Sequence, residues 1–381
     1  MTARMTAGSR EIRGRLILRD GVVAGRIALE DGRIAAVDPD PAAAGGPLIA
    51  PGFIDLHVHG WGGHDAMAPG PALDGMARGL LRHGVTAFLP TAVAAPMASL
   101  ATFADRVRGW IPRAPEDGAE PLGFNLEGPL LAPARKGAHD PAFLRTPASI
   151  TDAELAAVTD GLRIITIAPE LPGALDLIAR LAALGIDASL GHSAATLEEA
   201  QAGYAAGART TTHLFNAMSG VDHRDPGLAV AALTTDAAWV ELIADGIHVH
   251  PALWPLILRA KPADRLLLVS DAIPVAGTGD GRSMVGTLEV EVKDGRCTLV
   301  VGGNLAGSVV GLDSAVRNLV RAGVPLERAV AAASANPAAL LGAHDRGTIE
   351  AGRRADLVEL DDELQVRRVM RAGEWVADGA A

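Results

Sequence analysis

The middle of the chain repeats one pattern, a short apolar run followed by a longer segment rich in Ala and Leu. Segments such as "PALDGMARGLLRHG" and "TLEEAQAGYAAG" are typical of helices and separate most of the runs. Alternating strands and helices predict parallel strands joined by helical crossovers. Eight such units predict an α/β fold, a (β/α)8 TIM-like barrel. The predicted strands are Phe53–Val58, Thr86–Thr91, Leu122–Leu126, Arg163–Ala168, Ile186–Leu190, Thr210–Leu214, Trp239–Ala244 and Arg265–Ser270.

The two ends of the chain have a different pattern. Residues 11–50 and the C-terminal stretch alternate short apolar stretches with turns, such as "RDG" and "EDG", that are typical of antiparallel strands. We therefore predict a small β-sandwich domain built from residues 1–50 and 345–381. The barrel would occupy residues 51–344, with a β-hairpin insertion near 285–303 that turns at Asp294 and Gly295.

The composition disfavours several classes of partner. The formal net charge is −11, whereas a nucleic-acid-binding surface needs a basic face. We find no apolar run of membrane-spanning length, and the N-terminus lacks the apolar core of a signal peptide. The single cysteine, Cys297, excludes an intramolecular disulfide and favours a reducing compartment. We therefore expect a cytoplasmic protein that binds neither nucleic acid nor a membrane.

Side chains that bind metals or move protons follow six of the eight predicted strands. In "PGFIDLHVHG" two histidines are two residues apart, so both point to the same side of the strand. In a (β/α)8 barrel the active site lies at the carboxyl ends of the strands. The fold would therefore bring one set of residues together at that face: His57, His59, Glu127, His192, His213, His248 and Asp271.

Each of these residues has a structural alternative. A histidine at a strand end can be a hydrogen-bonded structural residue, and only the shared position favours a metal role for His192 and His213. Glu127 and Asp271 could cap helices, but Gly-Pro follows the first and Ile-Pro the second, and neither is a good helix start. For the pair in "HVH" the pattern leaves ligation and a structural role equally open.

This set of side chains indicates a particular chemistry. One carboxylate and two imidazoles can hold a divalent ion with an open position for water. Such an ion lowers the pKa of its bound water to about 7 and so supplies a nucleophile at neutral pH. Asp271 would accept the water proton and deliver it to a leaving amine, and His248 would donate a hydrogen bond to the developing oxyanion. The set therefore indicates hydrolysis of an amide or a related C–N bond.

The motifs that carry these residues resemble those of the amidohydrolase superfamily. The set "NLEGPLL", "KGAHDP", "GHS", "THLFNAM", "RDPGL", "DGIHV" and "SDAIP" is similar to the family of N-acetylglucosamine-6-phosphate deacetylases. The resemblance implies that Glu127, His192 and His213 bind the primary metal and that Asp271 is the general acid and base. It implies substrate contacts by Ala138, His139, Asn216, Ala217, Arg224, His248, Leu305, Ala306 and Gly307.

The same resemblance implies a cofactor and partners. We expect one or two divalent ions per subunit, with zinc as the first expectation and iron or another ion left open. The second ion would use His57 and His59. The substrate would be a phosphorylated amino sugar, and Arg224 would reach its phosphate across the interface of a homodimer.

Two other functions stay open at this point. One is an amidohydrolase that acts on a different N-acyl compound, such as an N-acyl-D-amino acid. The other is a non-catalytic protein with the amidohydrolase fold. Arg224, together with Asn216 and Ala217, favours the phosphorylated sugar over the amino acid. The complete set of metal ligands with Asp271 disfavours a non-catalytic protein.

Overall fold

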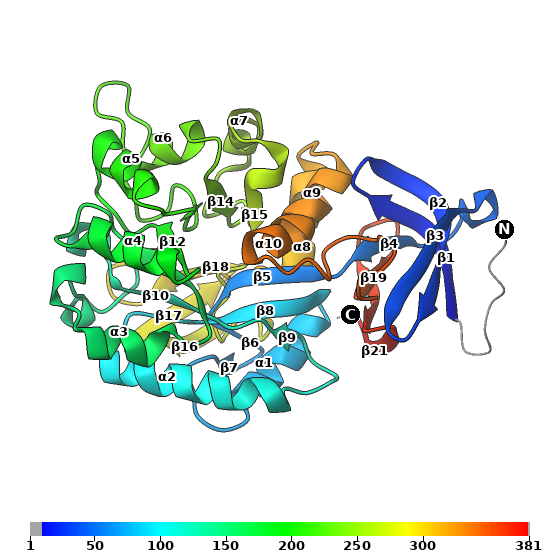
Figure 1. The fold of residues 1–381 in the computed structure, drawn as a ribbon, viewed down its shortest axis with the longest axis horizontal. Helices are drawn as coiled ribbons and strands as arrows, with labels where there is room; N and C mark the ends of the chain where they lie inside the picture. The colour runs from blue at the N-terminus through cyan, green and yellow to red at the C-terminus, as the bar shows by residue number, and fades with distance from the viewer. Residues whose placement is uncertain (1–9, 380–381) are drawn as a thin grey trace.

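The computed structural model describes residues 10–379, in which a barrel of parallel strands carries a separate sheet at one end (Figure 1). Hydrogen bonds order the barrel strands β15-β14-β13-β12-β11-β10-β8-β5, and the predicted (β/α)8 fold is confirmed. The short strand β9 (Glu120–Pro121) pairs with β8. The barrel strands are β5 (Phe53–Val58), β8 (Val85–Ala92), β10 (Phe124–Leu130), β11 (Leu162–Ile167), β12 (Asp187–Leu190), β13 (Thr210–Thr211), β14 (Trp239–Leu242) and β15 (Leu266–Leu268).

Helices cover the outside of the barrel (Figure 1). In α1, Leu73, Met76 and Leu80 are buried, at the spacing of an amphipathic helix. A capping box of Thr196 and Glu199 starts α5. Within residues 10–379 no helix is long and apolar enough to cross a membrane. The helices are α1 (Ala72–Leu81), α2 (Met97–Trp110), α3 (Asp152–Thr159), α4 (Ala174–Ala183), α5 (Leu197–Ala205), α6 (Leu228–Thr234), α7 (Trp254–Ala260), α8 (Leu312–Arg321), α9 (Leu326–Ala333) and α10 (Ala335–Leu341).

The barrel closes between β5 and the segment that follows β15. Asp271 N donates a hydrogen bond to His57 O at 2.8 Å, and His59 N donates to Ala272 O at 2.8 Å. An isolated parallel bridge joins Val58 to Ala272. The hydrogen bonds that close the barrel therefore also fix the main chain of three candidate site residues. Beyond β5, a short ribbon of β6 (Gly60–Trp61) and β7 (His64–Asp65) leads to α1.

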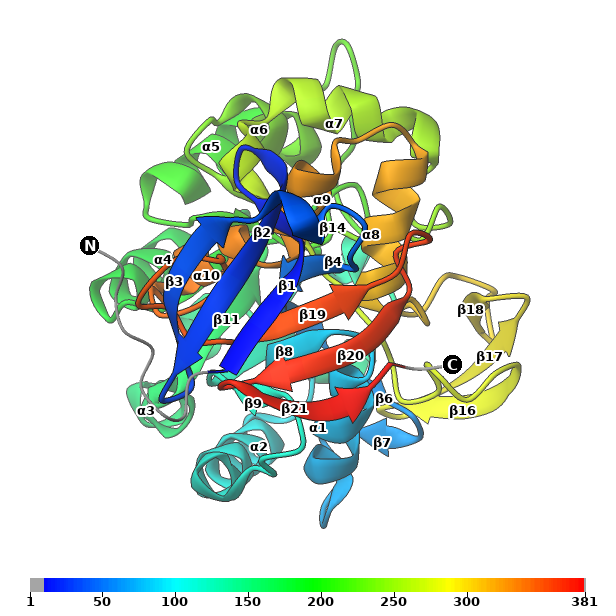
Figure 2. The same ribbon diagram turned by 90° about the vertical axis from the view of Figure 1, so that its right-hand side faces the viewer.

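The two ends of the chain form one seven-stranded sheet, ordered β21-β20-β19-β4-β1-β2-β3. Figure 2 shows the N-terminal and C-terminal strands side by side. Buried side chains from both parts, among them Ile27, Ile49, Leu357 and Met370, form one apolar core, as expected for a terminal sandwich. The domain boundaries at 50/51 and 344/345 stay predictions. The strands are β1 (Arg10–Leu18), β2 (Gly21–Glu30), β3 (Arg33–Pro39), β4 (Leu48–Pro51), β19 (Leu357–Leu360), β20 (Val366–Arg371) and β21 (Glu374–Asp378).

The insertion after β15 is a three-stranded antiparallel sheet, whereas the sequence predicted a hairpin. The predicted turn is present, because Asp294 and Gly295 connect β17 (Leu288–Lys293) to β18 (Arg296–Leu299) with φ values of 52° and 73°. The additional strand is β16 (Gly281–Val285), which pairs with β17. Most of its residues are exposed, so it lacks the apolar run by which a strand is identified in a sequence.

The position of Glu127 also differs from the prediction. The sequence predicted a strand that ends at Leu126, but β10 continues to Leu130 and contains Glu127. Asn125 and Glu127 are two residues apart and share one face of β10, where Asn125 Nδ2 donates to Leu56 O at 3.0 Å. The register against β11 is irregular between Leu126 and Leu130. The Gly-Pro pair after Glu127 indicates a strand end in the sequence, and in the structure it lies in this irregular part of β10.

Gly52 is the single residue between β4 of the terminal sheet and β5 of the barrel. Its N–H donates to Asp356 O at 2.8 Å. A Cβ atom added at Gly52 would lie 2.2 Å from Thr86 Oγ1 and 2.8 Å from Thr86 Cβ. The two domains are therefore joined at a position where the backbone packs directly against a barrel side chain.

We predict that Gly52→Ala lowers the free energy of unfolding by about 1–3 kcal/mol, the usual cost of forcing atoms into a packed site. Removing the Thr86 hydroxyl and methyl groups in Gly52→Ala/Thr86→Ala should recover part of this loss relative to Thr86→Ala alone. Gly45→Ala is the matched control, because nothing lies within 4 Å of a Cβ atom there. Urea titrations measure the four variants and the wild type, and equal stability of Gly52→Ala and Gly45→Ala would contradict the prediction.

Candidate active site

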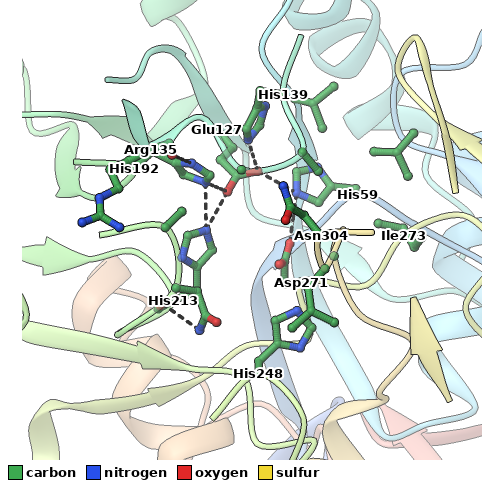
Figure 3. Close-up of a pocket in the computed structure, with 18 of the residues that line it drawn as sticks. His59, Glu127, Arg135, His139, His192, His213, His248, Asp271, Ile273 and Asn304 are labelled. Atoms are coloured by element: carbon green, nitrogen blue, oxygen red, sulfur yellow. Dashed lines mark hydrogen bonds and ion pairs between the residues drawn. The ribbon is translucent and has the colours of Figure 1, made fainter. Parts of the chain in front are cut away.

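A cavity of about 360 Å³ opens at the carboxyl ends of the barrel strands (Figure 3). It gathers most of the residues that the sequence singled out. Those that line it are His59, Glu127, Ala138, His139, His192, His213, Asn216, Ala217, His248, Asp271, Leu305 and Gly307. His57 is completely buried behind this wall, and Ala306 is buried in the core under the inserted sheet.

Glu127 forms one compact cluster with His192 and His213. Glu127 Oε1 lies 2.9 Å from His192 Nε2 and 2.8 Å from His213 Nε2. The two Nε2 atoms are 3.1 Å apart. All three side chains are nearly fully buried, and they come from three different strands or strand ends. The three predicted primary ligands therefore converge on a single point.

The other oxygen of Glu127 faces a second cluster, which contains His57, His59 and Asp271. Figure 3 shows Glu127, His59 and Asp271 of this cluster. His59 Nε2 lies 3.1 Å from Glu127 Oε2, 3.2 Å from Asp271 Oδ1 and 3.2 Å from His57 Nε2. His57 Nε2 lies 3.6 Å from both carboxylates. Asp271, which the sequence indicated as a proton carrier, is thus also a candidate ligand.

Hydrogen bonds on the outer side of three of these imidazoles determine their tautomers. His192 Nδ1 donates to Arg135 O at 2.8 Å, and His59 Nδ1 donates to Thr91 O at 3.2 Å. His57 Nδ1 donates to Glu241 Oε2 at 3.2 Å. Because carbonyl and carboxylate oxygens only accept, each Nδ1 carries the proton. In the neutral rings the Nε2 lone pairs therefore point into the clusters.

These lone pairs fit a divalent cation. Burial lowers the pKa of His192 to about 4, so the ring is neutral and its Nε2 lone pair faces Glu127 Oε1. A contact between two acceptors is favourable only when a positive charge lies between them. Ligand atoms about 2.0–2.1 Å from a tetrahedral ion lie about 3.3 Å apart, close to the spacing in both clusters. The metal that the family resemblance implies is therefore compatible with these nitrogen and oxygen atoms.

The other charges at the site favour the same conclusion. Burial disfavours the Glu127 carboxylate, but the imidazoles of His139 and His57 outweigh it and hold its pKa well below the usual range. Burial likewise opposes the charging of His59, yet Asp271 and Glu127 raise its pKa to about 9. Despite burial, the hydrogen bond with His59 lowers the pKa of Asp271. The ionised carboxylates therefore require positive charge, which protons or a metal can supply.

His139 contacts Glu127 in a different way. Its Nε2 lies 3.2 Å from Glu127 Oε2, so it belongs to a third group that could hold an ion. However, the main-chain N–H of Ala94 donates to His139 Nδ1 at 3.2 Å, and this nitrogen must therefore carry a lone pair. The proton is then on Nε2, which donates to Glu127. His139 is therefore a hydrogen-bond donor to the carboxylate and not a metal ligand.

The backbone is strained where it presents these side chains. His192, His213 and Asp271 have φ values of 46°, 26° and 48°, and Phe215 and Ala217 are also in the positive-φ region. Such conformations cost of order 1–3 kcal/mol each and cluster at functional sites. The strain here lies in segments that follow β12, β13 and β15, and it turns the candidate ligands toward one cavity.

Arg224 lies outside the cavity of its own chain. Residues 220–225 are exposed, and Figure 1 shows the chain between α5 and α6 looping away from the barrel. Asp222 Oδ1 accepts hydrogen bonds from Arg224 N at 2.8 Å and Asp225 N at 2.9 Å, which tightens the loop. His223, beside Arg224, is exposed as well.

The cavity also contains residues that the sequence analysis missed. They include Val93, Arg135, Ile273, Val285 and Asn304. Arg135 and Asn304 lie close to motifs that were recognised, "KGAHDP" and the 305–307 stretch, and proximity was the only available signal. Val93 and Val285 are ordinary apolar residues, which nothing in the sequence distinguishes from the core.

Comparisons with known proteins agree with this geometry. The Amidohydrolase family matches residues 48–376. N-acetylgalactosamine-6-phosphate deacetylase of Escherichia coli O157:H7 is 39% identical, covering 92% of this chain and 94% of that protein. N-acetylglucosamine-6-phosphate deacetylase of Bos taurus is 41% identical, covering 96% and 94%. A mutant N-acetyl-D-glucosamine-6-phosphate deacetylase of Mycobacterium smegmatis, in complex with N-acetyl-D-glucosamine-6-phosphate, has a TM-score of 0.90 at 34% identity, covering 97% and 99%.

The barrel and its cluster of histidines and carboxylates are those of a hydrolase, and the chain belongs to the amidohydrolase family. Within that family, the resemblance to N-acetylglucosamine-6-phosphate deacetylases is confirmed by relatives that span nearly the whole chain. These relatives favour a deacetylase over an N-acyl-D-amino acid hydrolase or a non-catalytic protein.

We predict that His213→Ala lowers the bound metal toward zero, because it removes one of three ligands while the barrel stays folded. Changing both His57 and His59 to Ala should remove only a second ion. His344→Ala, at an exposed histidine far from the cavity in sequence, should leave the metal content unchanged. Elemental analysis and circular dichroism measure metal and fold, and full occupancy in His213→Ala would contradict the assignment.

Proposed function

We propose that the chain hydrolyses the amide bond of N-acetylglucosamine 6-phosphate and releases acetate and glucosamine 6-phosphate, a step of amino-sugar catabolism. The observation that carries this proposal is the convergence of Glu127, His192 and His213 with Asp271 in one cavity. Its volume of about 360 Å³ is within the range of small-molecule sites, about 300–1,000 Å³. Relatives that deacetylate phosphorylated amino sugars support the choice of substrate.

In this proposal Glu127, His192 and His213 would hold the primary divalent ion, and a second ion could use His57 and His59. A bound ion would polarise the amide carbonyl and lower the pKa of water, which would make water nucleophilic at neutral pH. Asp271 accepts the proton of the attacking water, since its lowered pKa keeps it ionised. It then delivers that proton to the leaving nitrogen. Zinc is our first candidate, and iron is the alternative.

His248 has a more specific role than the sequence indicated. Its Nδ1 donates to Asp245 Oδ2 at 2.6 Å, so a neutral His248 offers only the Nε2 lone pair to the cavity. It can then accept a hydrogen bond from a sugar hydroxyl. Donation to an oxyanion would require a proton on Nε2 as well. We propose that His248 contacts the substrate through Nε2 and that, when this nitrogen carries a proton, it donates to the developing oxyanion.

Phosphate recognition is proposed to involve the neighbouring subunit of a homodimer. Arg224 is exposed on the loop between α5 and α6, away from its own cavity. Of the described residues that line the cavity, Arg135 alone is an arginine or lysine. An acidic chain with a net charge of −11 needs such local cations to bind an anion. Ala138, His139, Asn216, Ala217 and the 305–307 segment would contact the rest of the sugar.

A second candidate substrate is N-acetylgalactosamine 6-phosphate, because the Escherichia coli relative carries that name and is 39% identical. The two sugars differ only in the configuration of one hydroxyl, at C4. Values of kcat/KM for both sugars, measured side by side, decide between them.

We also propose a cytoplasmic location, which is supported only by the composition of the sequence.

We predict acetate release from N-acetylglucosamine 6-phosphate and little from an N-acetyl-D-amino acid. Asp271→Asn should lose about 10²–10⁴-fold in kcat, the usual range for general acid–base catalysis. The KM for the sugar should change much less, because the amide has nearly the same shape as the carboxylate. No acetate release by the metal-loaded wild type would refute the proposed function, and an unchanged kcat in Asp271→Asn would assign the proton transfer elsewhere.

We predict that Arg224→Ala lowers kcat/KM for the phosphorylated sugar by about 10- to 150-fold, from the 1.5–3 kcal/mol of a hydrogen bond to a charged group. The unphosphorylated sugar should be unaffected. Mixing Arg224→Ala with Asp271→Asn should restore one active site per mixed dimer, because the Asp271→Asn subunit supplies its arginine to the intact site of its partner. If mixed dimers form without any recovery, Arg224 serves its own subunit or has no role.

A further inference from the structure

Glu241 is a carboxylate in the interior of the barrel that no motif drew attention to. It lies in β14, between Val240 and Leu242, and is completely buried. A buried charge is costly unless it is paired and hydrogen-bonded. Among residues 10–379 its side chain has one ion-pair partner, His57, and its Oε1 atom has no hydrogen-bond partner. The position therefore carries a cost that needs a reason.

The contacts of its other oxygen supply that reason. Glu241 Oε2 accepts a hydrogen bond from His57 Nδ1 at 3.2 Å. The same atom accepts from the main-chain N–H of His213 at 3.1 Å. In addition, Glu241 O accepts from Leu214 N at 2.8 Å. One side chain thus contacts a ligand candidate in each of the two clusters.

The first contact decides which nitrogen of His57 faces the cavity. Because the carboxylate only accepts, Nδ1 keeps its proton, and Nε2 of the neutral ring presents its lone pair to His59 and to the carboxylates of Glu127 and Asp271. His57 has no exposed surface, so water cannot replace this partner. Without Glu241, the ring could turn over or exchange tautomers, and Nε2 would no longer be held in place as a metal ligand.

The second contact acts on the primary cluster through the backbone. His213 has a φ of 26°, which is unfavourable for a residue with a side chain. The bond from its N–H to Glu241 helps to hold that conformation. The bond is made by the backbone, so it does not determine the tautomer of His213, whose Nδ1 has no partner among the described residues. We therefore expect a weaker effect on the first ion than on the second.

We propose that Glu241 is the positioning residue that makes His57 an Nε2 ligand and so determines whether the second cluster holds an ion. Carboxylates that orient metal-binding histidines in this way typically change metal affinity 10- to 100-fold when removed. The full negative charge also helps to balance a second divalent cation beside Glu127 and Asp271. The catalytic meaning of this inference rests on the proposed metal-dependent function. Its test does not, because the test measures metal binding and not activity.

Asp187 provides a matched control for a purely structural role. It is a buried carboxylate on another barrel strand, β12, and accepts hydrogen bonds from Thr210 Oγ1 and Arg209 N. Among residues 10–379 no hydrogen bond or ion pair joins it to a candidate metal ligand. Burial raises its pKa to about 6, and the charge of Glu241 contributes to this increase, so it also has an electrostatic cost. If buried carboxylates act only by stabilising the barrel, Asp187→Asn and changes at Glu241 should affect metal binding alike.

The experiment is a Zn²⁺ titration of the metal-free full chain, with the thermal midpoint of each variant measured in parallel. We expect two ions per wild-type chain and a 10- to 100-fold weaker second ion in Glu241→Leu. Glu241→Gln should lose less, because an amide oxygen in the same place can still accept from His57. Asp187→Asn should bind both ions as the wild type does.

Several outcomes would overturn the proposal. They are a single ion in the wild type, wild-type affinity for the second ion in folded Glu241→Leu, or an equal loss in Asp187→Asn. If Glu241→Leu does not fold, Glu241→Asp is the deciding variant, because the shorter side chain keeps its charge but withdraws it from His57. Wild-type affinity for the second ion in Glu241→Asp would then overturn the proposal. An inactive chain with the expected binding pattern would refute the proposed function and leave this inference standing.

Discussion

The carboxylate of Glu127 is the group on which the rest of the site depends. One of its oxygens contacts His192 and His213, and the other contacts His59 and His139. A buried anion is stable only when positive charge or hydrogen-bond donors surround it. His139 supplies a donor, but His192 presents a lone pair toward the same carboxylate. The arrangement therefore needs positive charge among these side chains. A bound cation would supply it, which is the physical basis for describing the cavity as a candidate metal site.

The barrel explains how distant residues reach this carboxylate. Asn125 and Glu127 share one face of β10 because they are two residues apart, and His213 lies two residues after the end of the short strand β13. The closure of the barrel joins His57, His59 and Asp271 through main-chain hydrogen bonds. Strand geometry thus brings the candidate ligands to one face of the barrel, and the positive-φ residues after β12, β13 and β15 turn their side chains toward the cavity.

Two kinds of feature could be predicted from the sequence. They are the elements that follow from the period of the apolar pattern and the site residues that follow from their position at strand ends. The eight barrel strands were identified from apolar runs, and β5 has the predicted bounds, Phe53–Val58. The candidate metal ligands, His248 and Asp271 were found because strand ends meet at one face, whereas the other candidate substrate contacts came from the resemblance of the motifs. The strand β16 was missed because its exposed residues have no apolar pattern. Tautomers could not be predicted either, since the role of His139 depends on the main-chain N–H of Ala94, which is distant in sequence.

Glu241 illustrates the same limit, because a glutamate inside an apolar strand gives no sign of the histidine that it contacts. The central claim, that these side chains form a metal site around Glu127, is tested most directly by anomalous diffraction at the zinc edge from crystals grown with Zn²⁺. We predict a peak about 2.0–2.2 Å from Glu127 Oε1 and from the Nε2 atoms of His192 and His213. A well-ordered cavity without an anomalous peak, or a peak bound only by other residues, would contradict this account.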